Sequence, residues 1–156
     1  MAELSIESNG TIELTAVYYN GQQLGGLSEI FLNLSEDGTF DAVLSYYGTD
    51  GREYLKNPFT DYLDSVQYRE PSFTEEESRQ LHLLTIISDG EIDNTTVYFD
   101  NQMVDGLVNL FVHIKSPKKA KTSIFSASKK FVEGAIFKAT FTFRYEDGII
   151  RTEEIF

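Results

Sequence analysis

The chain has 156 residues, of which 41% are hydrophobic and 24% charged, so its composition is that of a folded globular protein and not of a disordered one. This length predicts a single domain over residues 1–156. The 25 acidic residues outnumber the 13 basic ones, and the net charge of −12 argues against extended nucleic-acid binding and against an anionic membrane. Cysteine is absent, which excludes disulfides, thiolate metal sites and cysteine nucleophiles.

Residues 3–55 alternate between apolar and polar positions with a period of two, which predicts an antiparallel meander. The turns between these runs end in glycine, namely Gly10, Gly38 and Gly51. A three-residue loop closed by a left-handed glycine keeps apolar residues opposite each other, whereas a two-residue loop would oppose Leu34 with Asp41. The pairs that the three-residue loop predicts are Leu34 with Phe40, Leu32 with Ala42, Ile30 with Leu44, Ile6 with Ile12, Leu4 with Leu14, and Tyr46 with Tyr54.

An insertion over about residues 59–80 separates the two strand-rich parts of the chain, and Pro58 and Pro71 lie at or near its limits. The sequence Thr74-Glu75-Glu76-Glu77 fits a capping box and predicts a short helix over 72–80, and 60–66 is a second helix candidate. Strands are predicted at 81–88, 96–99, 107–114, 122–125 and 136–145, with an edge strand at 149–156. No repeat with a period of 20–50 residues is visible.

About ten strands with one short helical insertion predict an all-β fold, either a small β-barrel or a two-sheet sandwich. One continuous apolar face is expected to form the core, made of Ile12, Leu14, Leu32, Leu34, Phe40, Leu44, Phe137, Phe141 and Phe143. Residues 1–10 do not resemble a secretory leader and no apolar stretch reaches membrane-spanning length, so we expect a cytoplasmic protein. A secreted form whose leader has been removed is left open.

Residues that could carry chemistry are few. Two histidines, His82 and His113, cannot build a three-histidine zinc site, and each is expected to make a local hydrogen bond. Asp89 and Asp100 have the spacing of a calcium loop, but Asn94 replaces the glycine that the sixth position requires, which favours an ordinary hairpin loop. Residues 126–129 match a serine–lysine spacing of acyl enzymes without its companion motifs. No catalytic residue, metal or cofactor is therefore predicted.

Tyrosines at strand ends are the first candidate binding residues: Tyr18, Tyr19, Tyr46, Tyr47 and Tyr54. Alternation sends one member of each adjacent pair inward and the other outward. Such aromatic side chains pack the ends of β-sheets, and they also line ligand mouths and protein interfaces. The sequence leaves both interpretations open.

A lysine-rich segment over residues 115–138 is the second candidate. Seven lysines and one glutamate give it a charge of +6, which leaves −18 for the rest of the chain. Lys118, Lys119 and Lys121 follow Pro117 and are expected in an exposed connection. They either form a solvated loop or make an electrostatic contact with an acidic subunit or a phosphate-bearing ligand.

The sequence therefore predicts a non-enzymatic binding or assembly domain, in the manner of a phage structural part, an inhibitor or an immunity-type protein. Its acidic surface suits a basic protein partner, and self-association is also expected. The alternative is a small β-barrel enzyme or carrier that binds an apolar molecule in its interior. Tyr18, Tyr46 and Tyr54 would line that pocket, with carboxylates at its mouth. A filled interior favours the first hypothesis, and an interior cavity favours the second.

Overall fold

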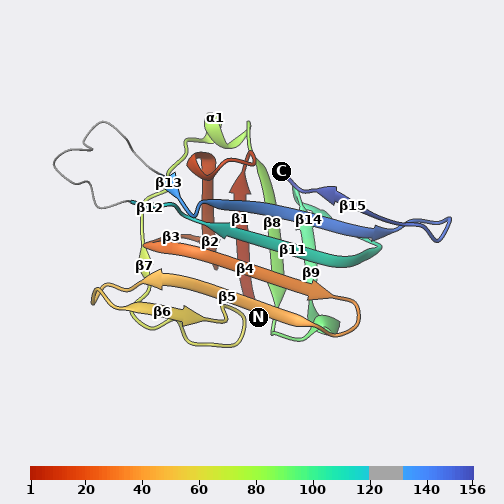
Figure 1. The fold of residues 1–156 in the computed structure, drawn as a ribbon, viewed down its shortest axis with the longest axis horizontal. Helices are drawn as coiled ribbons and strands as arrows, with labels where there is room; N and C mark the ends of the chain where they lie inside the picture. Colours follow the sequence, from red (N-terminus) through yellow and green to blue (C-terminus); the bar gives the residue numbers. More distant parts are fainter. Residues whose placement is uncertain (120–131) are drawn as a thin grey trace.

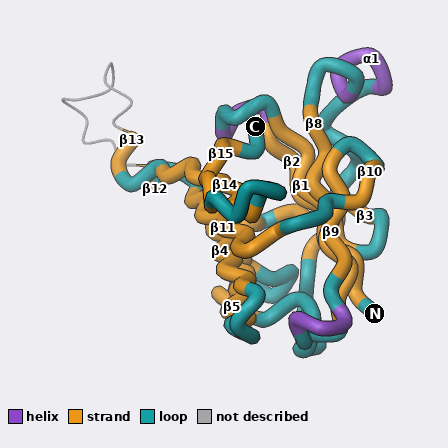
Figure 2. The backbone as a smooth tube through the Cα atoms, turned by 90° about the vertical axis from the view of Figure 1, so that its right-hand side faces the viewer, coloured by secondary structure: helices purple, strands orange, loops and turns teal. Residues whose placement is uncertain are grey.

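The computed structural model describes residues 1–119 and 132–156, and over these residues two antiparallel sheets pack face to face (Figure 2). The first sheet has the order β10 (Gln102–Met103), β9 (Thr96–Phe99), β8 (His82–Ser88), β1 (Ala2–Ser8), β2 (Thr15–Tyr19), β3 (Gln22–Gly25), β7 (Gln67–Tyr68). The second sheet has the order β15 (Ile150–Glu154), β14 (Ile136–Arg144), β11 (Leu107–Lys115), β4 (Leu27–Ser35), β5 (Phe40–Tyr47), β6 (Glu53–Lys56). A separate two-stranded ladder joins β12 (Lys118–Lys119) to β13 (Val132–Glu133).

The all-β prediction is confirmed, and the fold is a sandwich. The strands of the two sheets run across each other (Figure 1), and the described residues do not close into a barrel. The core lies between the sheets, where Leu32, Leu34, Leu44 and Phe141 are buried as predicted. Other expected core residues are partly buried and pack against this cluster, namely Ile12, Phe40, Phe137 and Phe143. Leu14 is a wrong prediction, because it is exposed.

The predicted register is confirmed at two turns and wrong at one. Leu34 pairs with Phe40 around Gly38, and Tyr46 pairs with Tyr54 around Gly51. The turn at Gly10 is longer than predicted. The 3₁₀ helix η1 (Ile12–Leu14) occupies the residues expected to pair with Ile6 and Leu4, so that Leu4 pairs with Tyr19 and Ile6 with Val17.

The predicted single meander over 3–55 is also wrong, because the chain changes sheets after β3. Gly25 and Gly26 lie at this change, and Gly26 has a φ of +69°. A Cβ on Gly26 would lie 2.6 Å from the carbonyl oxygen of Tyr47, so only glycine allows this close approach. Residues 3–55 therefore contribute β1, β2 and β3 to one sheet and β4, β5 and β6 to the other.

The insertion contains β7 and the one-turn helix α1 (Glu75–Ser78). The predicted capping box is present: Thr74 Oγ1 accepts from Glu77 N at 3.2 Å, and Glu77 Oε1 accepts from Thr74 N at 3.1 Å. The helix ends earlier than predicted, and 60–66 forms turns instead of a helix. The strand expected at 122–125 lies outside the described residues.

An internal repeat with an offset of 80 residues organises the fold. Many residues of the segment 3–34 recur as the same amino acid 80 positions later, in the segment 83–114. They are Leu4, Ile6, Ser8, Gly10, Ile12, Thr15, Val17, Tyr18, Gln22, Gly26, Leu27 and Phe31. The local structure repeats as well: η2 (Ile92–Asn94) is the equivalent of η1, and Asn20 and Asp100 both have a φ of 49°. The strands β1, β2, β3 and β4 thus correspond to β8, β9, β10 and β11, and the sheet order places β5 and β6 in positions equivalent to those of β14 and β15.

Side-chain hydrogen bonds repeat at the same positions. Ser8 Oγ accepts from Gly10 N at 3.0 Å and lies 2.8 Å from Thr15 Oγ1. The equivalent distances among Ser88, Gly90 and Thr95 are 3.0 and 2.7 Å. These polar contacts fix both turns in one geometry, so the two halves are built by the same local chemistry.

The two halves are related by an approximate twofold axis through both sheets. In the β1–β8 ladder Leu4 pairs with Ile86 and Ile6 with Leu84, so exchanging the halves leaves the ladder unchanged. Its centre is the pair Ser5–Thr85, whose hydroxyls lie 3.0 Å apart. β4 and β11 meet in the same way at the centre of the other sheet (Figure 1). Any chain segment present in one half only is therefore a departure from this symmetry.

Candidate functional site

Two equivalent clefts open between the sheets, one in each half. The first has a volume of about 190 Å³ and is lined by apolar residues that include Ile12, Val17, Leu24, Leu27 and Ile30. The second has a volume of about 370 Å³, and its lining includes the repeat equivalents Ile92, Val97, Val104, Leu107 and Leu110. The symmetry of the fold thus provides two versions of one site, and the second is the larger.

The first cleft is covered by the insertion. β7 pairs antiparallel with the edge of β3, and Arg69 N donates to Gln23 O at 3.0 Å. The Gln23 side chain donates from Nε2 to Ser72 Oγ at 2.7 Å and accepts from Ser72 N at 2.8 Å. Gln67 Nε2 donates to Tyr47 O at 2.7 Å and so links β7 to the opposite sheet. Strand pairing and side-chain contacts together hold a chain segment across this cleft.

The second cleft is open at the same place. Within the described part of the chain, β10 is the last strand of its sheet, and no strand pairs with its outer edge. We compared the burial of each residue in 21–30 with that of its equivalent in 101–110. The degree of burial differs only at residues 23, 24 and 25, each of which is more buried than its equivalent, 103, 104 or 105. Gln23 is 5% exposed, whereas its equivalent Met103 is 58% exposed. Between these two segments, the difference in burial is therefore confined to residues 23–25 and their equivalents 103–105, and β7 covers the first of these strips.

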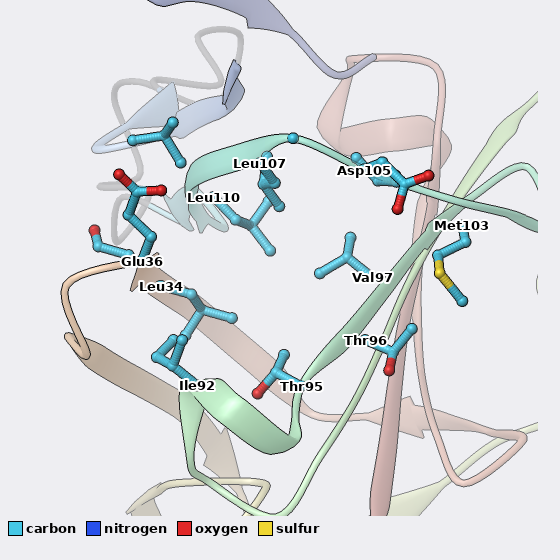
Figure 3. Close-up of a pocket in the computed structure, with 14 residues that line it drawn as sticks. Leu34, Glu36, Ile92, Thr95, Thr96, Val97, Met103, Asp105, Leu107 and Leu110 are labelled. Carbon is cyan, nitrogen blue, oxygen red and sulfur yellow. The ribbon is translucent and has the colours of Figure 1, made fainter. Parts of the chain in front are cut away.

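The open cleft combines an apolar wall with an acidic rim. Figure 3 shows Leu34, Leu110 and Val97 around the space. Glu36 and Asp105 also line the cleft. Glu36 is bound by Arg144, whose guanidinium donates to both carboxylate oxygens at 3.0 and 2.6 Å and lowers the pKa of Glu36. Among the residues that the structure describes, Glu36 thus has a cationic partner and Asp105 has none.

The edge of β10 offers backbone groups to a further strand. Val104 N donates to Val97 O at 2.9 Å, so residue 104 bonds inward to β9. Backbone groups alternate along an antiparallel strand, which turns the N–H and C=O of Met103 and Asp105 away from β9. Exposed strand edges of this kind are templates for pairing with another chain.

The predicted tyrosines do not form one site. Tyr46 is buried, its ring stacks on Tyr54 at 5.4 Å, and its hydroxyl donates to Asp64 O at 2.8 Å. Tyr47 is exposed on the outer face, and Tyr19 packs against the core. Tyr18 donates to Glu7 Oε1 at 3.2 Å, and burial with this carboxylate raises its pKa to about 12. None of these five tyrosines lines the open cleft.

The lysine-rich segment is described only in part. The backbones of Lys118 and Lys119 form β12 and pair with Glu133 and Val132, so the expected exposed connection contains a short ladder. Lys121 and residues 126–129 lie outside the described residues. The electrostatic contact of this segment stays a prediction.

The other candidates make local contacts. His82 Nδ1 lies 2.7 Å from Asp100 Oδ2 and His113 Nε2 lies 2.5 Å from Glu29 Oε2, which confirms the expected hydrogen bonds. Asp89 and Asp100 lie at opposite ends of the β8–β9 hairpin, so they do not share a calcium loop. Asp89 instead accepts from Glu91 N at 3.0 Å, as ordinary turn chemistry predicts.

Sequence reasoning missed the open cleft, because its apolar lining looks like any strand core. The usable signal was the repeat itself. Aligning residues 21–30 with 101–110 places Met103 opposite Gln23 and Asp105 opposite Gly25, at positions where the surrounding residues are similar.

We compared the chain with family models, with curated proteins and with solved structures, and none of the three comparisons finds a match. Among the helices that the structure describes, none has the length and apolar character needed to span a membrane. What the open cleft can bind is therefore derived from its own geometry and chemistry.

Proposed function

We propose that this chain is a non-enzymatic recognition domain that binds an extended segment of a partner protein in the open cleft. The observation that supports this proposal is the contrast between the two equivalent clefts. One framework holds β7 across the cleft of the first half, and the same framework presents an unpaired edge in the described second half. Addition of a peptide strand to such an edge is a recurrent mode of protein recognition.

The chemistry of the cleft favours binding of a peptide strand over catalysis. Main-chain hydrogen bonds to Met103 and Asp105 would supply affinity, and alternate side chains would enter the space beside Leu107 and Leu110. Catalysis by paired carboxylates needs two groups that are free to exchange protons. The lining holds Glu36 and Asp105, and Arg144 already binds Glu36 on both oxygens.

The alternative is a carrier of a small apolar molecule. Of Tyr18, Tyr46 and Tyr54, the three tyrosines expected to line an interior pocket, Tyr46 and Tyr54 stack their rings on each other at 5.4 Å. The open cleft has an apolar wall and a volume of about 370 Å³, at the lower end of the range for small-molecule sites. This observation moves the carrier hypothesis from the interior of the fold to the open cleft.

Selection from a random peptide library against the folded chain tests the proposal. Met103→Pro removes the N–H that a partner strand would bind, and proline is tolerated on a sheet edge. The matched control is Leu55→Pro on the edge strand β6. Gly48 N donates to Arg52 O, and the alternation from Arg52 turns the Leu55 N–H away from β5.

Enriched peptides are expected to bind the wild type and Leu55→Pro equally and to lose at least about tenfold in affinity for Met103→Pro, the loss of roughly one hydrogen bond. Enriched peptides that bind Met103→Pro as tightly as the wild type would contradict the proposal. A selection that enriches no peptide would also contradict it. Saturable binding of an apolar fluorophore to the same cleft, without any peptide, would favour the carrier.

A further inference from the structure

This inference rests on the proposed strand site. We infer that the bound partner segment carries a basic residue next to Asp105. Three positions further along the same segment, it carries an apolar residue that packs on Met103. The first half supplies the template for this assignment, because β7 and the residues after it show how a segment lies on this framework. Each difference between the two clefts then indicates how the partner differs from β7.

The template fixes the register. Tyr68 pairs with Leu24 and Gln67 with Gly25, and Arg69 N donates to Gln23 O. When this register is transferred by 80 positions, the partner runs antiparallel to β10. The partner residue in the place of Gln67 then lies opposite Asp105, and the next one, in the place of Tyr68, lies opposite Val104. The residue after these, in the place of Arg69, donates its N–H to the carbonyl oxygen of Met103.

Charge assigns the first side chain. A Cβ on Gly25 would lie 3.6 Å from the Cβ of Gln67 and 3.8 Å from that of Arg69, which is ordinary van der Waals contact. Asp105 therefore fits where Gly25 stands and brings a carboxylate beside the residue in the place of Arg69. The net charge of −12 favours a basic segment at longer range as well.

Polarity assigns the second side chain. Ser72 makes two hydrogen bonds with the Gln23 side chain in the first half, at 2.7 and 2.8 Å. Met103 has only a weak acceptor and no donor, so a serine at this place would lose both partners. An apolar residue would instead pack against the flexible thioether, which is 58% exposed without it.

Synthetic peptides test this chemistry directly. The probe is the chain's own sequence 64–73, because Arg69 is already the basic residue that Asp105 requires. The covalently linked copy in the first cleft has an effective concentration near millimolar, so the added peptide samples the second cleft. NMR shifts at the amides of Met103 and Asp105, with none at Gln23 and Gly25, would place it there.

Peptide Ser72→Leu is expected to bind about fourfold more tightly than the unmodified peptide, the gain of one buried methylene. Peptide Arg69→Glu is expected to bind about two- to fivefold more weakly, the range of an exposed ion pair. Protein Asp105→Lys should reverse the Arg69 preference and protein Met103→Gln the Ser72 preference. Asp41→Lys, on the outer face of β5, is the matched charge control and should change neither preference.

The two proposals fail in different ways. If library peptides bind the cleft but Asp105→Lys and Met103→Gln leave the preferences unchanged, the inferred side-chain chemistry is wrong and the strand site stands. If no peptide reaches Met103 and Asp105, the strand site itself is wrong. Concentration-dependent self-association that shifts these same amides, measured by sedimentation and NMR, would make the occupant a second copy and overturn the basic partner.

Discussion

The two halves of the molecule share one framework and differ in what lies across it. In the first half the insertion pairs with β3 and buries Gln23, while in the second half the same edge is exposed at Met103. The turns, the central ladders and the side-chain hydrogen bonds are otherwise alike in both. This difference teaches that the strands shared by both halves form the same structure with or without a further strand on their edge. The covering strand β7 is therefore not needed to form the cleft.

The largest expected effect tests whether the halves are energetically alike. Leu4 and Leu84 are equivalent and both 0% exposed. Leu4→Ala and Leu84→Ala should each lower the free energy of unfolding by about 2–5 kcal/mol, because each leaves a cavity in a close-packed core. Urea denaturation of both variants measures this. Costs that differ by more than about 2 kcal/mol would mean that the two halves are packed differently.

The second prediction separates the covered edge from the open one. Gln23→Ala should cost about 1–3 kcal/mol, because it removes both hydrogen bonds to Ser72 at a buried position. Met103→Ala should change stability by no more than about 0.5 kcal/mol, since Met103 is an exposed surface residue. The same urea experiment measures both. Equal costs at the two positions would show that the second edge is covered in solution.

The third prediction concerns two equivalent glycines with different neighbours. Gly10 and Gly90 have φ values of +98° and +101°, so alanine should cost about 1 kcal/mol at either. A Cβ at Gly90 would also clash with Thr60 Cγ2, a contact that the insertion creates. Gly90→Ala should therefore cost about 1 kcal/mol more than Gly10→Ala.

Thr60→Ser provides the control, because it removes Cγ2 and keeps the hydroxyl. In that background the two glycine variants should cost the same. A difference between them that persists without the methyl group would assign the extra cost to something other than the insertion.

The smallest effect concerns Tyr18, whose pKa is raised to about 12 by burial and by the Glu7 carboxylate. An unfolded tyrosine titrates near 10, so this contribution to stability is complete below pH 10 and is lost as pH rises from 10 to 12. Glu7→Ile copies the second half, where Ile87 stands at this position. It should lower the pKa of Tyr18 while leaving it above 10, because burial remains.

Ultraviolet titration of the wild type and Glu7→Ile, with Tyr18→Phe to identify the signal, measures the shift. An unchanged titration of Tyr18 in Glu7→Ile would rule out the carboxylate as a cause.

Local patterns predicted the elements of the fold well. The capping box at Thr74, the strand at 96–99 and the register at Gly38 depend on a few neighbouring residues, and each is confirmed. The turn after Ser8 was mispredicted because Ile12 fits strand alternation. The observed turn depends instead on Thr15 Oγ1, which donates to Thr11 O at 2.6 Å. The alternation of apolar and polar residues gives no information about this side-chain hydrogen bond.

Longer-range features needed information that strand patterns do not carry. The change of sheet at Gly26 depends on the close approach of Tyr47 O, which is a tertiary contact. Tyr46 at a strand end resembled a binding residue until Tyr54 and Asp64 were placed around it. The open cleft could have been found from sequence only by comparing equivalent positions 80 residues apart, an offset longer than the 20–50 residues typical of repeat proteins.

Amide hydrogen exchange at four residues tests the central claim most directly. In the free monomer, the amides of Gln23 and Gly25 should exchange slowly because β7 covers them, and those of Met103 and Asp105 should exchange rapidly. Adding the residue 64–73 peptide that carries Ser72→Leu should protect Met103 and Asp105 alone. Slow exchange at these two amides in the dilute free protein, or no protection at saturating peptide, would contradict the claim that the second cleft is an open strand site.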